Sequence, residues 1–223
     1  MDYPEHTSTQ FDIELKNVCT NVFRMGEAVE NQFRLAIDCL ATLDSEKIER
    51  VINEGTLINE MEIDIDESCI NLLVLRQPTA NDLRLVKTII KTINDLERIG
   101  DEAESIARST KIILKKGTEF LPRQSQLKYV AEIATDMLRA ALEAFDGMDA
   151  EAARKVGHKD SLIDEEFRSI LRHLVAYMME DNSDFSLAMQ TALMARSIER
   201  AGDHAKNISE HVVYMMEGRT ARN

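Results

Sequence analysis

The chain has 223 residues, 44% of them hydrophobic and 30% charged, with a formal net charge of −13. It is long enough to bury the core of one large globular domain or two small ones. The negative charge argues against nucleic-acid binding as the main activity and against docking on an anionic membrane through a basic face. With only 8 Gly, 3 Pro and 5% aromatic residues, the composition favours long helices over strands.

Six helices are expected, joined by short breaks, and each should span about 40–50 Å. Asp44 is the expected N-cap of the second helix, and Thr79 with Asp82 resembles a capping box before the third. The helices are expected at about Phe11–Leu43, Ser45–Arg76, Thr79–Lys116, Arg123–Phe145, Asp149–Glu180 and Ser183–Glu217.

The cysteines and the N-terminal residues indicate where the protein works. Cys19, Cys39 and Cys69 are odd in number, form no CxxC motif and lie among apolar residues, which is typical of reduced core cysteines in the cytoplasm. No apolar run approaches the roughly 20 residues needed to span a bilayer. The first ten residues lack the basic and apolar regions of a signal peptide. We therefore expect a cytoplasmic protein.

The two halves of the chain repeat one another. Residues 96–107 read LERIGDEAESIA and residues 198–209 read IERAGDHAKNIS, with six identities in twelve positions at a constant offset of 102 residues. At an offset of 105, the second helices match weakly: Asp44, Val51 and Ile58 with Asp149, Val156 and Ile163. A repeat of this length indicates a duplicated unit that packs on its twin. The sequence predicts an all-α fold of two tandem three-helix bundles, residues 1–118 and 119–223.

Two pairs of carboxylates recur within this repeat. Glu97 and Asp101 are four residues apart, as are Glu199 and Asp203, so each pair shares one face of a helix. Like charges at this spacing destabilise a helix by a few tenths of a kcal/mol, and the mid-helix glycine within each pair costs about 1 kcal/mol. Since both costs occur twice in one register, the sequence predicts a role that offsets them.

The surroundings of these carboxylates suggest metal binding. An apolar stripe through Val86, Ile90 and Ile93 continues into the first pair, and Asp160 with Asp164 interrupts a similar stripe on the fifth helix. Carboxylates that face other helices must be paired, protonated or bound to a metal. Oxygen ligands suit Mg²⁺, Mn²⁺ or iron, with Zn²⁺ as a further candidate.

Ordinary ion pairing is the alternative reading of the same acids. Their partners at solvated helix edges would then be Arg98, Arg200, Lys87, Lys159 or Arg196. Acid pairs four residues apart are common on solvated helix faces, so the residues alone leave both readings open.

The histidines are weaker metal-ligand candidates. His158, His173, His204 and His211 form no Glu-x-x-His arrangement, the motif that ferritin-like di-iron proteins use. His204 follows Asp203 and points about 100° away from it. The sequence also has no GxxxxGK[ST], GxGxxG or GxSxG, so it shows neither a nucleotide-binding loop nor a nucleophile elbow.

At these residues the chain resembles the PhoU family over nearly its full length. The paired ERxGD segments are the specific features, and the other landmarks are His6-Thr7-Ser8 with Phe11 and Leu15, Met25-Gly26, Gln77-Pro78 and Asp82-Leu83-Arg84. The resemblance implies two symmetric three-helix bundles whose E(D)xxxD motifs bind metal clusters. It carries that role onto Glu97, Asp101, Glu199, Asp203, Asp160 and Asp164.

The resemblance also implies a function. Members are cytoplasmic, often homodimeric and without a known catalytic reaction. They act with the ATPase subunit of the Pst phosphate ABC transporter and with the PhoR sensor histidine kinase, and they contact the membrane only through these partners. When phosphate is plentiful they restrain uptake and keep the Pho regulon off.

The first repeat departs from the family pattern. At an offset of 105, Asp160 and Asp164 correspond to Gly55 and Asn59. Glu60 and Asp64 lie nearby but about 100° or more around the helix, so they and Asn59 are secondary candidates. We expect the two repeats to bind metal unequally.

Two other functional classes stay open from the residues. One is a carboxylate-bridged metalloenzyme with an open coordination position, although the sequence shows no evident base or nucleophile. The other is a metal-storing or purely structural helical bundle.

Overall fold

The computed structural model describes residues 9–76, 80–117, 121–179 and 184–218. These residues form seven helices and no strand, so the all-α prediction is confirmed. The helices are α1 (Thr9–Thr42), α2 (Ser45–Arg76), α3 (Ala80–Lys115), α4 (Gln124–Gly147), α5 (Ala150–Gly157), α6 (Asp160–Met178) and α7 (Phe185–Glu217). Within the described part of the chain, no helix is both long and apolar enough to cross a membrane.

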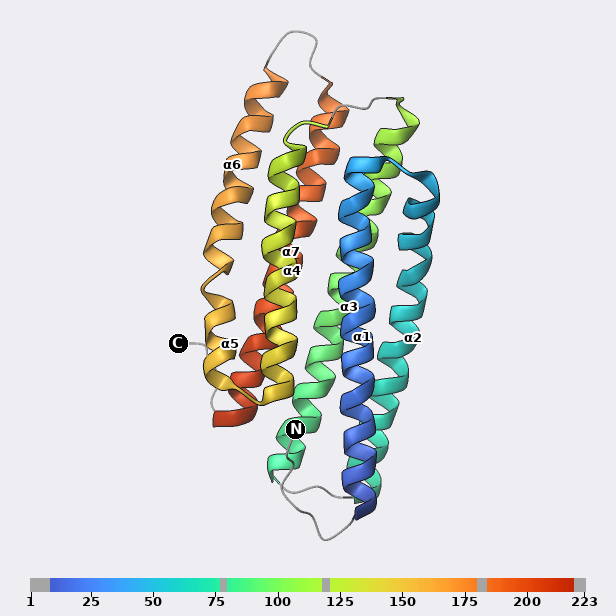
Figure 1. Cartoon of the computed structure of the whole chain (residues 1–223), viewed down its shortest axis with the longest axis vertical. Helices are drawn as coiled ribbons and strands as arrows, with labels where there is room; N and C mark the ends of the chain where they lie inside the picture. Colours follow the sequence, from blue (N-terminus) through green and yellow to red (C-terminus); the bar gives the residue numbers. More distant parts are fainter. Residues whose placement is uncertain (1–8, 77–79, 118–120, 180–183, 219–223) are drawn as a thin grey trace.

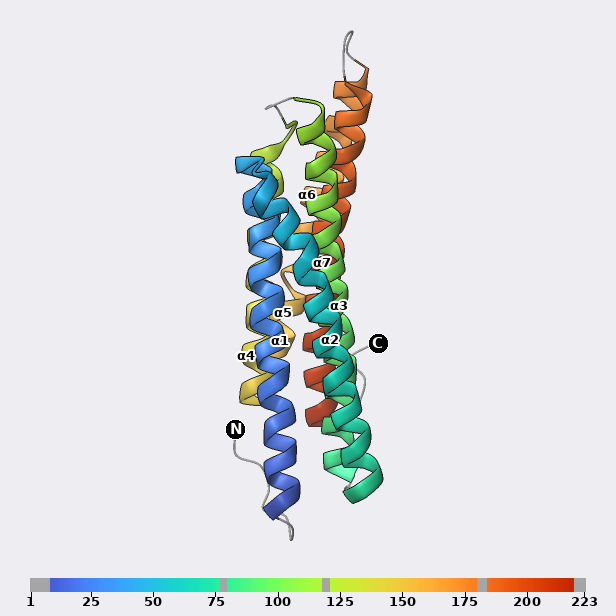
Figure 2. The same cartoon turned by 90° about the vertical axis from the view of Figure 1, so that its right-hand side faces the viewer.

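The helices form an elongated bundle of two layers with a helix on each edge. In the two perpendicular views, α1 and α4 form one layer and α3 and α7 the opposite one (Figures 1 and 2). On the edges lie α2 on one side and α5 with α6 on the other. A half-turn in the plane of Figure 1 roughly exchanges α1 with α4, α2 with α5 and α6, and α3 with α7. The chain therefore has an internal pseudo-two-fold axis normal to the layers.

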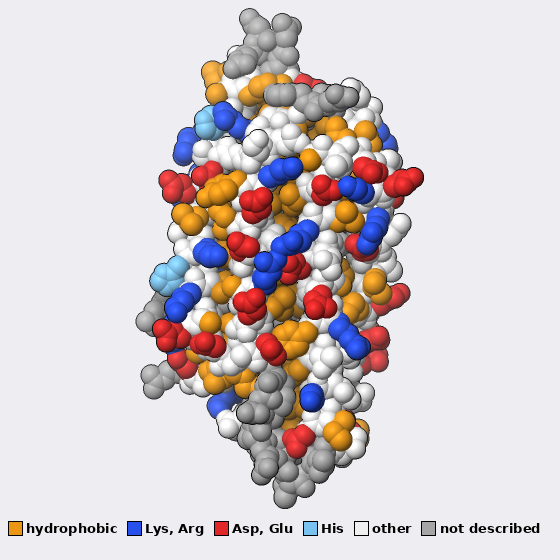
Figure 3. Space-filling view, viewed as in Figure 1, with side chains coloured by type: hydrophobic (Ala, Val, Ile, Leu, Met, Phe, Trp, Pro, Cys, Tyr) orange, Lys and Arg blue, Asp and Glu red, His pale blue; other side chains and the backbone are white. Residues whose placement is uncertain are grey.

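The core lies between the layers and extends under both edges. Large side chains such as Phe33, Leu96, Phe145 and Ile198 are buried in one continuous apolar cluster. The outer surface of the α1 and α4 layer carries charged side chains of both signs among scattered apolar ones (Figure 3). This mixed surface is typical of solvent-facing helices.

The most extensive contact in the bundle joins α3 and α7, which run antiparallel. At one end Lys116 bonds Asp184 at 3.0 Å, and near the other the Lys87 ammonium lies 3.4 Å from the Tyr214 hydroxyl. The two repeats therefore meet through their third helices.

Aspartates cap the starts of three helices, and the cap expected at Asp44 is confirmed. Asp44 Oδ1 accepts bonds from the amides of Glu46 and Lys47, and Asp149 caps α5 in the same way. Each satisfies amides that the first helical turn leaves without a partner. Asp184 Oδ1 accepts from the Leu187 amide at the start of α7.

The prediction of one continuous fifth helix is wrong, because α5 and α6 are separated at His158 and Lys159. The amides of these residues bond carbonyls three positions back, to Lys155 and Val156, so one tight turn replaces the α-helical pattern. Gly157, a poor helix former, precedes the turn.

Several sequence features lie outside the described residues: His6-Thr7-Ser8, Gln77-Pro78, Thr79, the expected helix ends at Glu180 and Ser183, and the expected boundary between 118 and 119. Cys19, Cys39 and Cys69 are buried and form no disulfide, as predicted.

Candidate metal centre

The two mid-helix glycines let the second helix of each repeat approach the third. A Cβ added at Gly100 would lie 3.1 Å from Gln32 Oε1 and 3.4 Å from Ile58. A Cβ added at Gly202 would lie 2.6 Å from Ile163 Cδ1. Ile58 and Ile163 are equivalent in the repeat, so the same close contact occurs twice. The helical cost of each glycine is therefore offset by packing that brings acidic residues of two helices together.

In the second repeat this packing forms a cluster of four carboxylates, Asp160 and Asp164 of α6 with Glu199 and Asp203 of α7. The side chains of Glu199 and Asp160 are only 10% and 15% exposed. Burial raises the pKa of Glu199, and the charges of Asp203, Asp164 and Asp160 raise it further. The pKa of Asp203 is raised by partial burial and then by Asp160 and Asp164. The four predicted residues thus share one negative site.

Basic side chains compensate part of this charge. The ion pairs are Lys206 Nζ with Asp160 at 2.6 Å, Arg196 with Glu199 at 2.7 Å and Arg168 with Asp164 at 3.3 Å. Glu199 Oε2 is nevertheless buried without a hydrogen-bond partner. A buried carboxylate oxygen left unpaired is costly, so the cluster retains an unmet demand for a cation or a proton.

The first repeat has a different acidic set. Glu97 is mostly buried and Asp101 is exposed, and Arg98 lies 3.4 Å from the first and 3.3 Å from the second. The pKa of Glu97 is raised by burial, then by Asp101 and by Glu62 of α2. Glu62 is thus the acid that α2 contributes here.

The secondary candidates on α2 are therefore not those nearest to the site. Asn59, Glu60 and Asp64 are exposed. Glu62 lies one turn beyond the buried Ile58, on the face that meets α3. The spacing of four residues between Ile58 and Glu62, which puts both on one side of α2, was the signal in the sequence that could have identified Glu62.

Glu104 is a second residue that the sequence reasoning missed. Its Oε2 would lie 3.2 Å from a Cβ added at Gly55, and it accepts a bond from Arg108 at 2.7 Å. At the equivalent positions of the second repeat, Asp160 of the second helix bonds Lys206 of the third. The acid of this position is therefore on the third helix in the first repeat and on the second helix in the second repeat. An alignment of position 104 with position 206 would have revealed this exchange.

Metal binding fits the donor chemistry of these clusters. Carboxylate oxygens suit hard divalent cations, and the buried unpaired oxygen of Glu199 would be satisfied by one. Among the residues that the structure describes, however, no three His, Cys, Asp or Glu side chains are arranged as a metal requires. Binding would therefore require side-chain rearrangement, starting with displacement of Lys206.

The ion-pair reading accounts for part of the pattern. Arg98 and Arg196 pair with the carboxylates beside them, as it predicts. Arg200 instead bonds Glu102 of α3 at 2.8 Å, and Lys87 lies over the ring of Tyr214.

Two of the histidines connect the two repeats and are not part of the acidic clusters. His204 Nδ1 and His211 Nε2 lie 2.8 Å and 2.9 Å from the two oxygens of Asp95, and Asn207 donates to the same carboxylate at 3.2 Å. Burial alone would raise the pKa of Asp95, but these hydrogen bonds lower it below its ordinary value. Asp95, which the sequence did not single out, thus holds α7 against α3.

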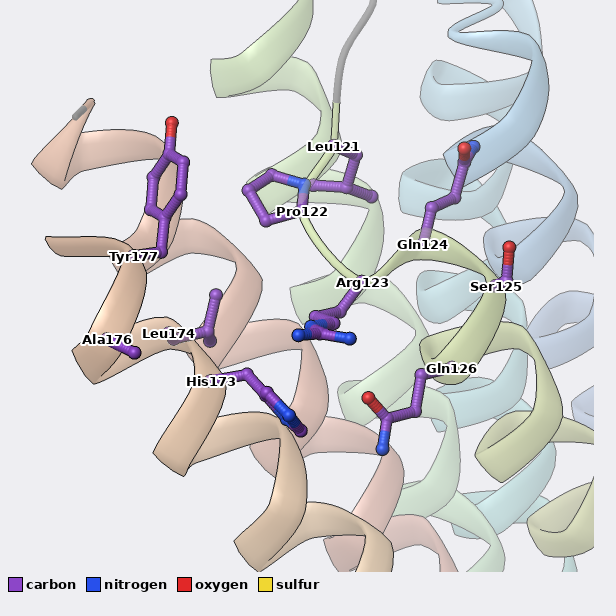
Figure 4. A pocket seen from close by; sticks show the side chains of 10 residues that line it. All are labelled: Leu121, Pro122, Arg123, Gln124, Ser125, Gln126, His173, Leu174, Ala176 and Tyr177. Atoms are coloured by element: carbon purple, nitrogen blue, oxygen red, sulfur yellow. The ribbon is translucent and has the colours of Figure 1, made fainter. Parts of the chain in front are cut away.

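A cavity of about 670 Å³ lies elsewhere, where the start of α4 meets the end of α6. Figure 4 shows Arg123, His173 and Tyr177 around it. His173 Nδ1 contacts the Ser169 carbonyl of its own helix at 2.8 Å, and Gln126 donates to Glu166 at 2.6 Å. None of the predicted carboxylates lines this cavity, so it is separate from the candidate metal centre.

Comparisons with known proteins agree on one family. The PhoU domain model matches residues 22–110 and again residues 127–212. A Burkholderia protein named phosphate-specific transport system accessory protein PhoU homolog is 41% identical over 98% of this chain and 94% of its own length. The Escherichia coli phosphate-specific transport system accessory protein PhoU is 39% identical over 98% of this chain and 90% of its own.

Two solved structures have the same fold. The crystal structure of PhoU from Pseudomonas aeruginosa matches with a TM-score of 0.90 and 39% identity, covering 94% of this chain and all of that one. The phosphate transport system regulatory protein PhoU from Streptococcus pneumoniae matches with a TM-score of 0.87 and 29% identity, covering 96% of this chain and 100% of that one.

Proposed function

The chain belongs to the PhoU family, and on this premise we propose that it restrains phosphate uptake and represses the phosphate-starvation response without catalysing a reaction. One observation carries the proposal: relatives named as accessory proteins of the phosphate-specific transport system match 98% of the chain at 39–42% identity. The printed names of these relatives describe an accessory role in transport and no catalysed reaction.

We propose further that the chain is a cytoplasmic adaptor between the ATPase subunit of the Pst transporter and a PhoR-like sensor kinase, and that it works as a homodimer. The names of the relatives support the link to the transporter. The acidic composition supports basic protein surfaces as partners, since charge of one sign steers association with the other. Each family match would correspond to one three-helix unit, residues 1–118 and 119–223.

Divalent metal binding is a second proposed property, and the unpaired Glu199 Oε2 favours it. In the second repeat the ligands would be Asp160, Asp164, Glu199 and Asp203. In the first they would be Glu97, Asp101 and Glu62, with Glu104 nearby. A bound Mg²⁺, Mn²⁺, iron or Zn²⁺ ion would neutralise each cluster and fix two helices together.

Phosphatase-reporter activity tests the regulatory role. In a strain that lacks the gene and grows in abundant phosphate, we expect high activity that the wild-type chain silences. Low activity in the deletion strain, in the absence of a second homologous gene, would contradict the proposal. Complementation with Glu97, Asp101, Glu199 and Asp203 changed to Ala would then show whether the carboxylates matter for repression.

Calorimetric titration of chelator-treated protein with Mn²⁺ tests the metal proposal separately. We expect the Glu199→Gln/Asp203→Asn variant to lose the tighter binding event. Glu151→Gln, which removes an 81% exposed acid of the neighbouring helix, is the control and should bind as wild type does. No heat of binding in the wild type would remove the metal proposal and leave the regulatory one intact.

A further inference from the structure

Large apolar side chains remain exposed at two opposite ends of the molecule. At one end they lie on the last turns of α2 and the first turns of α3, and at the other on the end of α6 and the start of α7 (Figure 1). The exposed fraction is 69% at Val74 and 83% at Met179. The two groups, here called the apolar corners, are Ile70, Val74 and Leu83 at one end and Val175, Met179 and Phe185 at the other.

The internal repeat relates the two corners residue by residue. Ile70 and Val74 correspond to Val175 and Met179 at the offset of 105, and Leu83 corresponds to Phe185 at the offset of 102. Exposed apolar character is not kept everywhere in the repeats, since Lys87 and Lys91 correspond to Met189 and Leu193. Leu57 and Leu162 are one further exposed pair related by the offset of 105, but they lie away from the two ends of the molecule. The shared pairs at the ends are therefore more numerous than the shared pairs elsewhere among these positions.

Each corner includes one residue on the side of α3 or α7 that carries an exposed aspartate of an acidic cluster. Leu83 precedes Asp101 by 18 residues, which is about five helical turns, so both project from one side of α3. Phe185 and Asp203 have the same spacing on α7. Leu83 and Phe185 thus lie on the same side of their helices as the exposed Asp101 and Asp203 of the two acidic clusters.

The separation of the corners follows from the helix geometry. Phe185 adjoins Asp184, which bonds Lys116 at the far end of α3. Leu83 and Lys116 are 33 residues apart on one helix, which places the corners about 50 Å from each other. The pseudo-two-fold axis passes between them.

We propose that the two corners together bind a protein partner that is itself a two-fold symmetric homodimer. Each subunit of this partner would have one apolar depression, and each corner would insert into one of them. A solvent-exposed apolar group marks an interaction site, and two equivalent groups related by a half-turn match the repeated surface that a symmetric dimer presents. A partner with a single copy of its surface would engage one corner and leave the other exposed. The inference deepens the proposed adaptor role and rests on it for the existence of a protein partner.

Two simultaneous contacts also set the energetics. Once the first corner is bound, the second corner binds within the same complex. The high effective concentration of its binding site then raises the overall affinity above that of one corner alone. Loss of one corner should therefore weaken binding by at least about 100-fold, while the remaining corner still binds. Single and double variants separate this behaviour from one extended contact surface.

Photo-crosslinking in living cells tests the proposal without assuming the partner's identity. A benzoylphenylalanine probe replaces Val74 or Met179 in the full chain, and crosslinked polypeptides are identified by mass spectrometry. Leu57 and Leu162 are the matched control positions, because they are also exposed and repeat-related but stand about 140° around their helices from Ile70 and Val175.

We expect probes at Val74 and Met179 to crosslink to the same polypeptide and probes at the control positions to crosslink to none. We also expect the mass of the purified complex to correspond to two copies of the partner for each copy of this chain. In that complex, Val74→Asp or Met179→Asp alone should weaken binding at least about 100-fold, and both together should abolish it. Different polypeptides from the two corners, crosslinks only to a second copy of this chain, or no crosslink would overturn it. The phosphatase reporter is a separate readout: if the wild type fails to silence it while both corners capture one dimer, the proposed function fails and the docking face stands.

Discussion

Arg200 of α7 bonds Glu102 of α3 at 2.8 Å, across the contact between the two repeats. Glu102 is 6% exposed in its side chain, whereas Arg200 is 47% exposed. Arg98, which the repeat places at the position of Arg200, bonds acids of its own helix, Glu97 and Asp101. The same residue type thus has a structural role in one repeat and a local one in the other.

Arg200→Ala should lower the free energy of unfolding by about 2 kcal/mol, because it leaves a buried carboxylate without its partner. The measurement is equilibrium unfolding in urea. Arg98→Ala is the control: Arg98 is 58% exposed and its partners Glu97 and Asp101 are 17% and 44% exposed, so the loss should be smaller, at less than about 1 kcal/mol. Equal losses in the two variants would contradict the distinction, and Glu102→Gln added to Arg200→Ala should restore part of the loss.

Asp95→Ala should also destabilise the protein by about 2 kcal/mol, since it removes three hydrogen bonds from α7 and leaves His204 and His211 without their acceptor. Thermal unfolding of the purified protein measures the effect. Asn94→Ala provides the comparison, because the exposed Asn94 side chain donates to Ile90 of its own helix. If the two substitutions shifted the midpoint equally, Asp95 would not hold the repeats together.

The sequence predicted the helices and the repeat because both follow from local patterns. Apolar periodicity and the cap at Asp44 depend on residues a few positions apart. The partners of Asp95 are 109 and 116 residues away, and no periodicity indicates which residues meet at that distance. Glu62 was missed for a related reason: the rotation of α2 against α3, which packing decides, determines which acid faces Glu97.

The tight contact at Gly202 predicts that its replacement depends on Ile163. Gly202→Ala gains about 1 kcal/mol of helix propensity, but its Cβ would lie 2.6 Å from Ile163 Cδ1 in a buried site, where overpacking costs roughly 1–3 kcal/mol. Ile163→Val removes that Cδ1 atom. In this background Gly202→Ala should be more favourable than in wild type by about 1 kcal/mol, as measured by a double-mutant cycle.

Gly157→Ala is the matched control for that cycle. Nothing lies within 4 Å of a Cβ added there, so the substitution should stabilise the protein by about 0.5 kcal/mol whether or not Ile163 is changed. Additivity of Gly202→Ala with Ile163→Val would show that the contact does not limit the site.

The second acidic cluster predicts a pH dependence of stability in metal-free protein. The pKa values of Glu199 and Asp203 are raised in the folded state, so the folded protein binds protons more readily than the unfolded chain does above the ordinary values of 4.5 and 3.8. The stability that these groups contribute is fully present below those values and is lost as the pH rises through the folded-state pKa values.

Urea unfolding between about pH 4 and pH 8, after treatment with a chelator, measures this dependence. The Glu199→Gln/Asp203→Asn variant should gain stability over wild type as the pH rises, because it lacks the like charges. Asp95 has a lowered pKa and contributes in the opposite direction, so the difference between variant and wild type is the quantity to compare. A constant difference across the range would mean that the carboxylates titrate alike in the folded and unfolded states.

Lys206→Met should raise the affinity of the second repeat for Mn²⁺. The Lys206 ammonium lies 2.6 Å from Asp160 Oδ2, so a divalent ion must displace it before Asp160 can become a ligand. Removing this competing charge should strengthen binding by about 5- to 10-fold, or roughly 1 kcal/mol, as measured by calorimetric titration. Lys155→Met is the control, because Lys155 is 75% exposed and pairs only loosely with Glu151 at 3.9 Å. A weaker affinity in Lys206→Met than in Lys155→Met would mean that the ammonium supports the ligand arrangement instead of competing with the ion.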